Sequence, residues 1–224
     1  MVPVHRSQSG SCHPAGAAAA WPLASGPLTA AVTTATIAGM AARPVPSLLR
    51  GFSAPVRLES VQSDDELLFL LRHDADLCNR WEAMQRIQSR AVTALIEAGA
   101  AGPDAAMPPA LIAAYRSVLD AEEADSAWRA LALRLPTFAG IADGRQSIAV
   151  EAIDDALRAI RNALAGALRA NWEALYAQHH DAAPYAFGAA AAGRRALANR
   201  ALGFLTSDTA GRALALRQFR VADN

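Results

Sequence analysis

The sequence has 224 residues, a length that usually forms one or two domains with a sizeable buried core. Its 21 basic and 21 acidic residues give a formal net charge of zero, and every basic residue is an arginine. A nucleic-acid partner would need a basic excess or a basic stripe, and because the chain has neither, we expect no nucleic-acid partner.

Residues 1–41 form a leader rich in Ala, Ser, Thr, Gly and Pro, with no charged side chain between Arg6 and Arg43. Pro22 and the Gly26-Pro27 pair interrupt its apolar stretches, which stay shorter than the roughly 20 residues that a membrane span requires. We therefore expect a disordered or non-native leader and no membrane partner. A signal peptide or anchor is the alternative.

Two short apolar stretches punctuated by proline follow, at residues 45–49 and 55–58. Proline cannot donate to a β-ladder from a central position, so both stretches predict edge strands. Ser63 and Glu66 then have the spacing of a capping box, in which each side chain bonds the backbone amide of the other residue. The sequence thus predicts a sharp change from strand to helix.

Apolar residues recur at helical spacing from Ser63 to the end of the chain. Asp125 or Ser126 opens one of the expected helices, and Ser207 or Asp208 caps the last. Beyond the helix that opens at the capping box, we expect helices at 77–98, 109–120, 126–135, 137–141, 147–178, 189–205 and from 208 onward.

The second of these helices has one apolar stripe, formed by Leu77, Trp81, Met84, Ile87, Ala91 and Leu95. We expect this stripe to pack into the core with Trp81 as its anchor, and a docking groove for a partner is the alternative. Cys78 lies on or beside the same stripe and is predicted to be a buried free thiol. Cys78 and Cys12 form no spacing pattern, which argues against a disulfide framework and fits a cytoplasmic location.

Antiparallel helix pairs joined by short loops predict a mainly α fold, an antiparallel helical array or superhelix preceded by a short β segment. No fixed sequence period accompanies the pairs. We expect the last helix to leave an apolar face exposed, which favours self-association.

Catalytic and metal-binding patterns are not found in the sequence. None of the five histidines stands in a His-Glu-x-x-His pattern, there is no Gly-x-Ser-x-Gly elbow, and no Gly-rich phosphate loop occurs. His179-His180-Asp181 is interpreted as a polar helix end, with a ligand cluster as the weaker alternative. Arg194, Arg195 and the arginines of residues 158–169 are expected to face water, with an acidic partner as the alternative. We expect no catalytic residue and no metal ligand, and we leave substrate-binding residues unassigned.

Four motifs surround the predicted change from strand to helix: RPVPSLLRGFSAPVRLE at 43–59, DDEL at 64–67, LRHD at 71–74 and NRWEA at 79–83. Together they resemble the bacterial aminopeptidase N (alanyl aminopeptidase) family of zinc metallo-aminopeptidases. Looser matches continue through LRLP at 133–136, EALY at 173–176, RRAL at 194–197 and QFRVADN at 218–224. The resemblance implies that residues 42–60 are the last strands of a β-sandwich and that residues 61–224 are a truncated helical C-terminal domain.

The resemblance also implies a function. The family removes N-terminal amino acids from peptides with a zinc site whose motif this chain lacks, so the chain is expected to be inactive alone and to need no cofactor of its own. Its expected partners are the catalytic and β-sandwich domains of a parent enzyme, with peptides as the parent's substrates. A stand-alone helical interaction module or a truncated gene product is the alternative.

Overall fold

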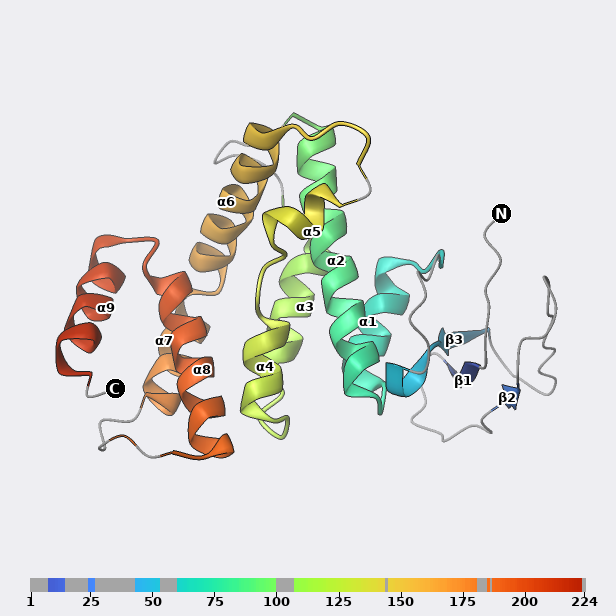
Figure 1. Ribbon diagram of the computed structural model, residues 1–224, viewed down its shortest axis with the longest axis horizontal. Helices are drawn as coiled ribbons and strands as arrows, with labels where there is room; N and C mark the ends of the chain where they lie inside the picture. Colours follow the sequence, from blue (N-terminus) through green and yellow to red (C-terminus); the bar gives the residue numbers. More distant parts are fainter. Residues whose placement is uncertain are drawn as a thin grey trace. The chain divides into compact units, whose positions relative to one another are not determined.

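The computed structural model describes residues 8–14, 24–26, 43–52, 60–99, 107–143, 145–180, 185 and 187–222. The fold class predicted from the sequence is confirmed: a mainly α array of helices follows a short β segment (Figure 1). The chain divides into two compact units, Met1–Met84 and Gln85–Asn224.

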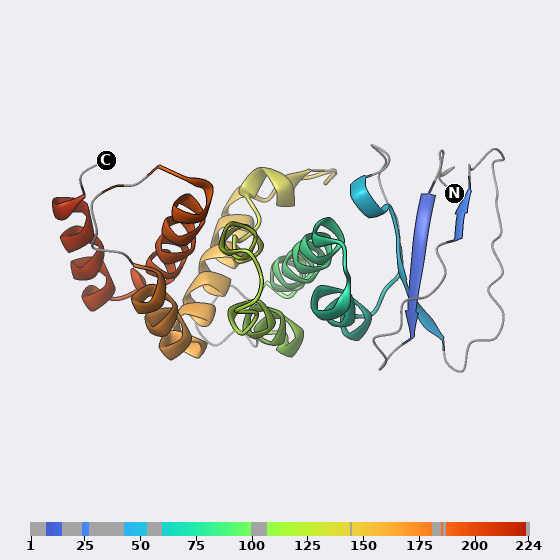
Figure 2. The same ribbon diagram turned by 90° about the horizontal axis from the view of Figure 1, so that it is seen from below.

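The first unit contains a small antiparallel sheet of three strands, β1 (Gln8–Pro14), β2 (Ala24–Gly26) and β3 (Pro44–Ser47). β1 lies between the other two strands, as Figure 2 shows, and Ser11 of β1 pairs with Ser47 of β3. β1 and β2 fall within the predicted leader, whose remaining residues lie outside the described part. The interpretation of residues 1–41 as a leader therefore stays a prediction.

The strand predicted at residues 45–49 is present but shorter, because β3 ends at Ser47. Leu49 adopts a left-handed conformation with φ 55°, and the 3-10 turn η1 (Arg50–Phe52) follows with Gly51 at φ 64°. A left-handed residue cannot continue a strand, so the chain turns away from the sheet here. The strand predicted at 55–58 lies outside the described residues.

Helix α1 (Asp64–His73) begins at the capping box that the sequence predicted. The Glu66 amide donates to Ser63 Oγ at 3.2 Å, and the Ser63 amide donates to Glu66 Oε2 at 2.8 Å. Leucines on one face of α1 are buried, and α1 packs against β3. Local cap chemistry and an apolar face thus act together to place this helix.

Helix α2 (Leu77–Glu97) agrees with the predicted stripe only in its later turns. Met84, Ile87, Ala91 and Leu95 are buried, but Leu77 is 46% exposed and Trp81 is half-buried. The prediction that Cys78 is a buried thiol is wrong, since its side chain is exposed. Helical spacing identifies a face, but it does not tell how far along the helix that face is covered.

The second unit continues through α3 (Pro109–Leu119), α4 (Ser126–Ala132), α5 (Phe138–Ala142), α6 (Val150–Ala167), α7 (Arg169–His179), α8 (Ala189–Leu205) and α9 (Thr209–Val221). The sequence left open whether Asp125 or Ser126 begins α4 and whether Ser207 or Asp208 caps α9, and the side-chain hydrogen bonds identify the aspartate in both cases. Asp125 accepts from the amides of Ala127 and Trp128, and Asp208 accepts from the amide of Gly211. The bounds of α8 are those predicted.

The single long helix predicted at residues 147–178 is wrong. The structure has two helices there, because the backbone breaks at Leu168, where φ is −120° and ψ is 24°. Gly166 is a weak helix former just before the break. Trp172 then turns its indole N–H to the carbonyl of Leu164 at 3.0 Å, and both Leu168 and Trp172 become buried. Burial of two large side chains outweighs the continuity of one helix.

Helix α8 is central to the second unit, since it packs against α4, α6, α7 and α9. Two glycines allow close approaches around it. A Cβ at Gly193 would lie 3.1 Å from the backbone nitrogen of Ala127 in α4, and a Cβ at Gly211 would overlap the carbonyl of Leu205. These positions accept no larger side chain without movement of the backbone.

An aromatic cluster forms the core of this unit. The rings of Trp172 and Phe204 stack with centroids 4.2 Å apart, and Tyr115 meets both rings edge-on at 6.1 and 5.9 Å. These are the preferred geometries of aromatic pairs. The cluster joins α3, α7 and α8, which are distant in sequence.

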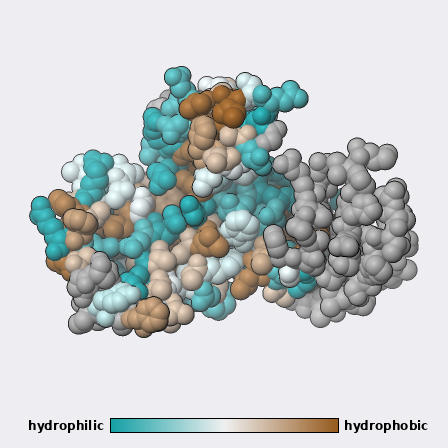
Figure 3. Space-filling view, in the orientation of Figure 1, coloured by the Kyte–Doolittle hydropathy of each residue, from teal (hydrophilic) through white to brown (hydrophobic). Residues whose placement is uncertain are grey.

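Some apolar side chains remain on the surface. Ile148 and Val150 are 53% and 59% exposed at the start of α6, and Leu216 and Phe219 are 49% and 79% exposed on α9. Figure 3 shows hydrophobic surface over both places, mixed with hydrophilic surface on α9. Among the described residues, no helix combines the length and apolar character that crossing a membrane requires.

Candidate functional site

Three histidines with described side chains, His73, His179 and His180, do not gather with other possible metal ligands. His73 of α1 lies against the ring of Phe69, with centroids 4.9 Å apart, and the ring of His180 stacks on Tyr176 at 4.8 Å. Within the described ranges, no three His, Cys, Asp or Glu side chains come together in a group that could hold a metal ion. Asp181 of the His179-His180-Asp181 cluster lies outside them, so that interpretation stays a prediction.

A buried polar network gathers residues of the first, third and fourth resemblance motifs, in the region from β3 to α2. We call it the junction network, formed by Ser47, Arg50, Asp74, Asp76 and Asn79. Its centre is the carboxylate of Asp74, whose side chain is 0% exposed. That carboxylate accepts a hydrogen bond from Ser47 Oγ and one from Arg50 Nη1 at 2.7 Å. A buried charge is thereby both paired and hydrogen-bonded, which burial requires.

The rest of the junction network fixes the backbone on either side. Asp76 accepts from the amide of Gly51 at 2.5 Å and from the amide of Cys78 at 2.8 Å. Asn79 donates through Nδ2 to Ser47 Oγ at 2.7 Å and to the carbonyl of Leu48 at 2.9 Å. The network therefore ties the end of β3 to the start of α2. All of its groups are engaged with one another, which is typical of a positioning role and not of a reacting one.

Except for Asp76, these residues belong to the motifs of the resemblance, and the sequence predicted no interaction for any of them. Ser47 and Asp74 are 27 positions apart, and no helical or strand period connects them. A cue was nevertheless present, since Asp74 and Asp76 frame the break between two predicted helices, where aspartate side chains commonly cap backbone amides.

A second buried network lies in the unit Gln85–Asn224. Gln88 of α2 is fully buried and donates through Nε2 to Tyr115 Oη at 3.0 Å and to the carbonyl of Ala132 at 3.2 Å. Burial raises the pKa of Tyr115, so this hydroxyl stays protonated at ordinary pH. The network joins α2, α3 and the end of α4, and the sequence had indicated only an apolar face here.

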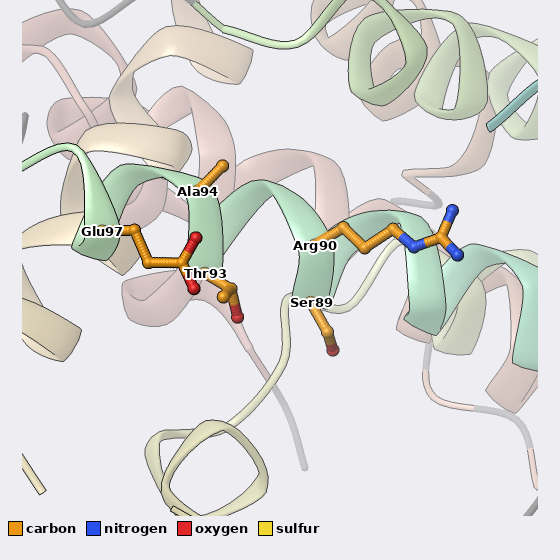
Figure 4. Close-up of a pocket in the computed structure, with 5 residues that line it drawn as sticks. All are labelled: Ser89, Arg90, Thr93, Ala94 and Glu97. Carbon is orange, nitrogen blue, oxygen red and sulfur yellow. The ribbon is translucent and has the colours of Figure 1, made fainter. Parts of the chain in front are cut away.

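A shallow groove of about 360 Å³ lies along α2 and is lined by Ser89, Arg90, Thr93, Ala94 and Glu97. Figure 4 shows that all five side chains come from this one helix. Arg145 reaches Thr93 Oγ1 through Nη2 at 3.0 Å, which ties the segment after α5 to this part of α2. The groove contains hydroxyls and one carboxylate but neither a histidine nor a cysteine, so it offers no activated nucleophile.

His179, at the end of α7, is the titratable group most affected by its surroundings among the histidines. Both ring nitrogens are buried, and neither has a hydrogen-bond partner among the described residues. Burial lowers the pKa of His179, and the positive charges of Arg129 and Arg194 lower it further, while Glu122 acts in the opposite direction.

We expect His179 to make the protein less stable as the pH falls below about 6.5, the ordinary histidine pKa. In that range the unfolded chain binds a proton at this residue, whereas the folded chain stays neutral until its lower pKa is reached. The free energy of unfolding, measured by urea titration at pH 7.5 and at 5.5, should fall less in His179→Gln than in the parent chain.

The matched control is His180→Gln, one residue away and exposed. This variant should keep the parent's pH dependence. Identical pH dependence in the parent chain and in His179→Gln would contradict the assignment.

Comparisons with known proteins support the resemblance drawn from the motifs. A family described as "Domain of unknown function (DUF3458_C) ARM repeats" matches residues 64–224. Aminopeptidase N of Escherichia coli is 33% identical over 193 residues, covering 81% of this chain and 21% of that protein. Aminopeptidase N of Caulobacter vibrioides is 33% identical over 165 residues, covering 74% of this chain and 19% of that protein.

A solved structure agrees in fold. The crystal structure of Legionella pneumophila aminopeptidase A in complex with aspartic acid superposes with a TM-score of 0.74 at 23% identity. The match covers 96% of this chain and 26% of that chain. The chain thus spans about a fifth of the length of the two aminopeptidase N relatives.

Proposed function

The chain belongs to the DUF3458_C family of ARM-repeat domains, and from this we propose that it serves as the non-catalytic helical domain of an aminopeptidase N-like enzyme. The observation that carries the proposal is the junction network. The motifs that resemble aminopeptidase N supply its central residues, and these residues hold a β segment against the first helices. A domain that must be presented at a fixed angle by a preceding β module needs such a rigid connection.

In this role the helices wall a chamber over the parent's zinc site and restrict access to small or unfolded peptides. The zinc ion, its ligands and the catalytic water belong to the parent's catalytic domain. The catalytic domain and the β-sandwich domain of the parent are the partners of this chain. The parent acts by removing N-terminal amino acids from peptides. The absence of a cysteine framework in the sequence supports a cytoplasmic location.

The first test is an assay of the purified chain on alanine-linked chromogenic amides with zinc added. We expect no turnover, because the described residues offer neither a metal site nor an activated nucleophile. Turnover that a chelator abolishes would contradict the non-catalytic role.

A chimera tests the domain role itself. In Escherichia coli aminopeptidase N, the 193-residue region similar to this chain would be replaced by this chain. We expect the chimera to hydrolyse the chromogenic amide and the corresponding deletion to be inactive. A folded, zinc-loaded chimera with no more activity than the deletion would favour the alternative of a stand-alone interaction module.

A further inference from the structure

In the unit Gln85–Asn224, Arg200 lies close enough to Arg134 and Arg161 for their charges to act on it. Arg200 of α8 is half-buried, and its Nε donates to the carbonyl of Ala130 at 3.2 Å. Arg134 follows Ala130 by four residues, which is about one helical turn. Its amide still bonds the carbonyl of Leu131 at 3.1 Å, so the turn continues to Arg134. Arg134 and Arg200 are thus attached to the same short stretch of backbone.

Arg161 approaches from α6. Its guanidinium carbon lies 6.0 Å from the centre of the Phe204 ring. Phe204 follows Arg200 by four residues on α8, so Arg161 and Arg200 extend over the same face of that helix. We call Arg134, Arg161 and Arg200 the arginine cluster.

The positive charge of the arginine cluster is not balanced locally. No carboxylate of the described residues forms an ion pair with any of its three members, whereas Arg158, one turn before Arg161, pairs with Asp154 and Asp155. Tyr115 is close enough to interact with the cluster, but burial raises its pKa and keeps it neutral. Burial and the charges of Arg134 and Arg161 together lower the pKa of Arg200. Arg134 and Arg161 are exposed and Arg200 is half-buried, so an anion can reach the cluster from solvent. Neighbouring positive charges disfavour one another, and an anion between them reverses this effect.

We propose that the arginine cluster is a binding site for an oxyanion, a phosphate or carboxylate group. Guanidinium groups present paired N–H donors that match both groups, and such charge-assisted bonds are stronger than neutral ones. Arg200 is already held by the carbonyl of Ala130, so part of the ordering cost is met before the anion arrives. The proposal rests on these side chains and is independent of the proposed aminopeptidase role.

The site is tested by isothermal titration of the full chain with sodium phosphate and, separately, with sodium acetate. Sodium chloride at equal ionic strength is the control titration. The parent chain should give saturable heat with at least one of the two oxyanions and none with chloride. The stronger of the two arms identifies the group as phosphate or carboxylate. Arg161→Gln and Arg134→Gln should each weaken binding about ten-fold, the loss of one charge-assisted hydrogen bond.

Arg158→Gln is the matched control, because it removes the same charge from an exposed position of α6 outside the cluster. It should bind the oxyanion as the parent does. The proposal would be overturned if neither salt gave saturable heat, or if Arg158→Gln weakened oxyanion binding as much as Arg161→Gln does. Arg200 would then serve only to cap the end of α4.

Thermal melting provides a second readout that does not depend on detecting heat. Phosphate or acetate should raise the melting temperature of the parent and of Arg158→Gln above its value in chloride, because a ligand stabilises the state that it binds. The same salts should leave Arg161→Gln unchanged relative to chloride. Equal shifts in all three proteins would also overturn the proposal.

Discussion

Asp74→Ala is expected to lower the free energy of unfolding by about 3–5 kcal/mol, the usual cost of removing one partner of a buried ion pair. The substitution leaves Arg50 without its carboxylate, and it also removes the acceptor that Ser47 Oγ and the amide of Asp76 use. The Ser47 hydroxyl and the Asp76 amide would then need another acceptor, and a buried donor that loses its acceptor lowers stability. Guanidinium denaturation followed by circular dichroism measures the loss.

Two further variants test whether the loss of stability comes from the charge of Asp74 and from its buried position. Asp74→Asn keeps the shape but loses the charge, so its cost should be smaller, about 2 kcal/mol. Glu82→Ala removes an exposed carboxylate from α2 and should change stability by less than about 0.5 kcal/mol. If Asp74→Ala were as mild as Glu82→Ala, the junction network would have no structural importance. Amide hydrogen exchange at Asp76 should accelerate in Asp74→Ala, which locates the effect.

The sequence predicted best what depends on neighbours in the chain. Ser63, Asp125 and Asp208 were identified as possible caps from their residue types, and each accepts from an amide two or three residues later. Capping is decided within one helical turn, so a short stretch of sequence contains all the necessary information. The same holds for the bounds of α8.

The predictions that failed depend on contacts distant in sequence. The break at Leu168 follows from the fold-back of α7 that buries Trp172 against Phe204, a residue 32 positions further along the chain. The pairing of Arg50 with Asp74, which was not predicted, spans 24 positions, and the arginine cluster combines residues of α6, α8 and the segment after α4. Helical spacing contains no term for such pairings, because it describes one helix at a time.

Arginine side chains repeatedly satisfy carbonyls near helix ends. Arg80 donates to Leu71 of α1, Arg145 to Ile141 of α5, and Arg200 to Ala130 of α4. The last carbonyls of a helix have no partner within it and carry the negative end of its dipole, so a cation from a neighbouring helix is favourable there. Short helices have proportionally more such ends. Arginine is therefore well suited to an array of short helices, since one guanidinium can donate several hydrogen bonds to the unpaired carbonyls at a helix C-terminus.

The most buried example is Arg129, and its replacement is the second large effect that we expect. Arg129 is 2% exposed, and it donates through Nε to the carbonyl of Val118 at 3.1 Å and through Nη2 to that of Leu119 at 2.6 Å. Arg129→Ala should lower the free energy of unfolding by about 4 kcal/mol, because it opens a cavity and leaves two carbonyls at the end of α3 without these donors. Urea denaturation followed by circular dichroism measures this change.

Comparison of two further replacements separates packing from hydrogen bonding at this position. Arg129→Met retains most of the buried volume and loses both donors, so it should cost about 2 kcal/mol. Arg129→Lys keeps a charge but cannot reach two carbonyls in the same fork geometry, and its cost should lie below that of Met. Arg116→Met, at an exposed position in the last turn of α3, should be nearly neutral. Equal stability of Arg129→Met and the parent would mean that water replaces the guanidinium at the end of α3, and the arginine caps would then be of little energetic importance.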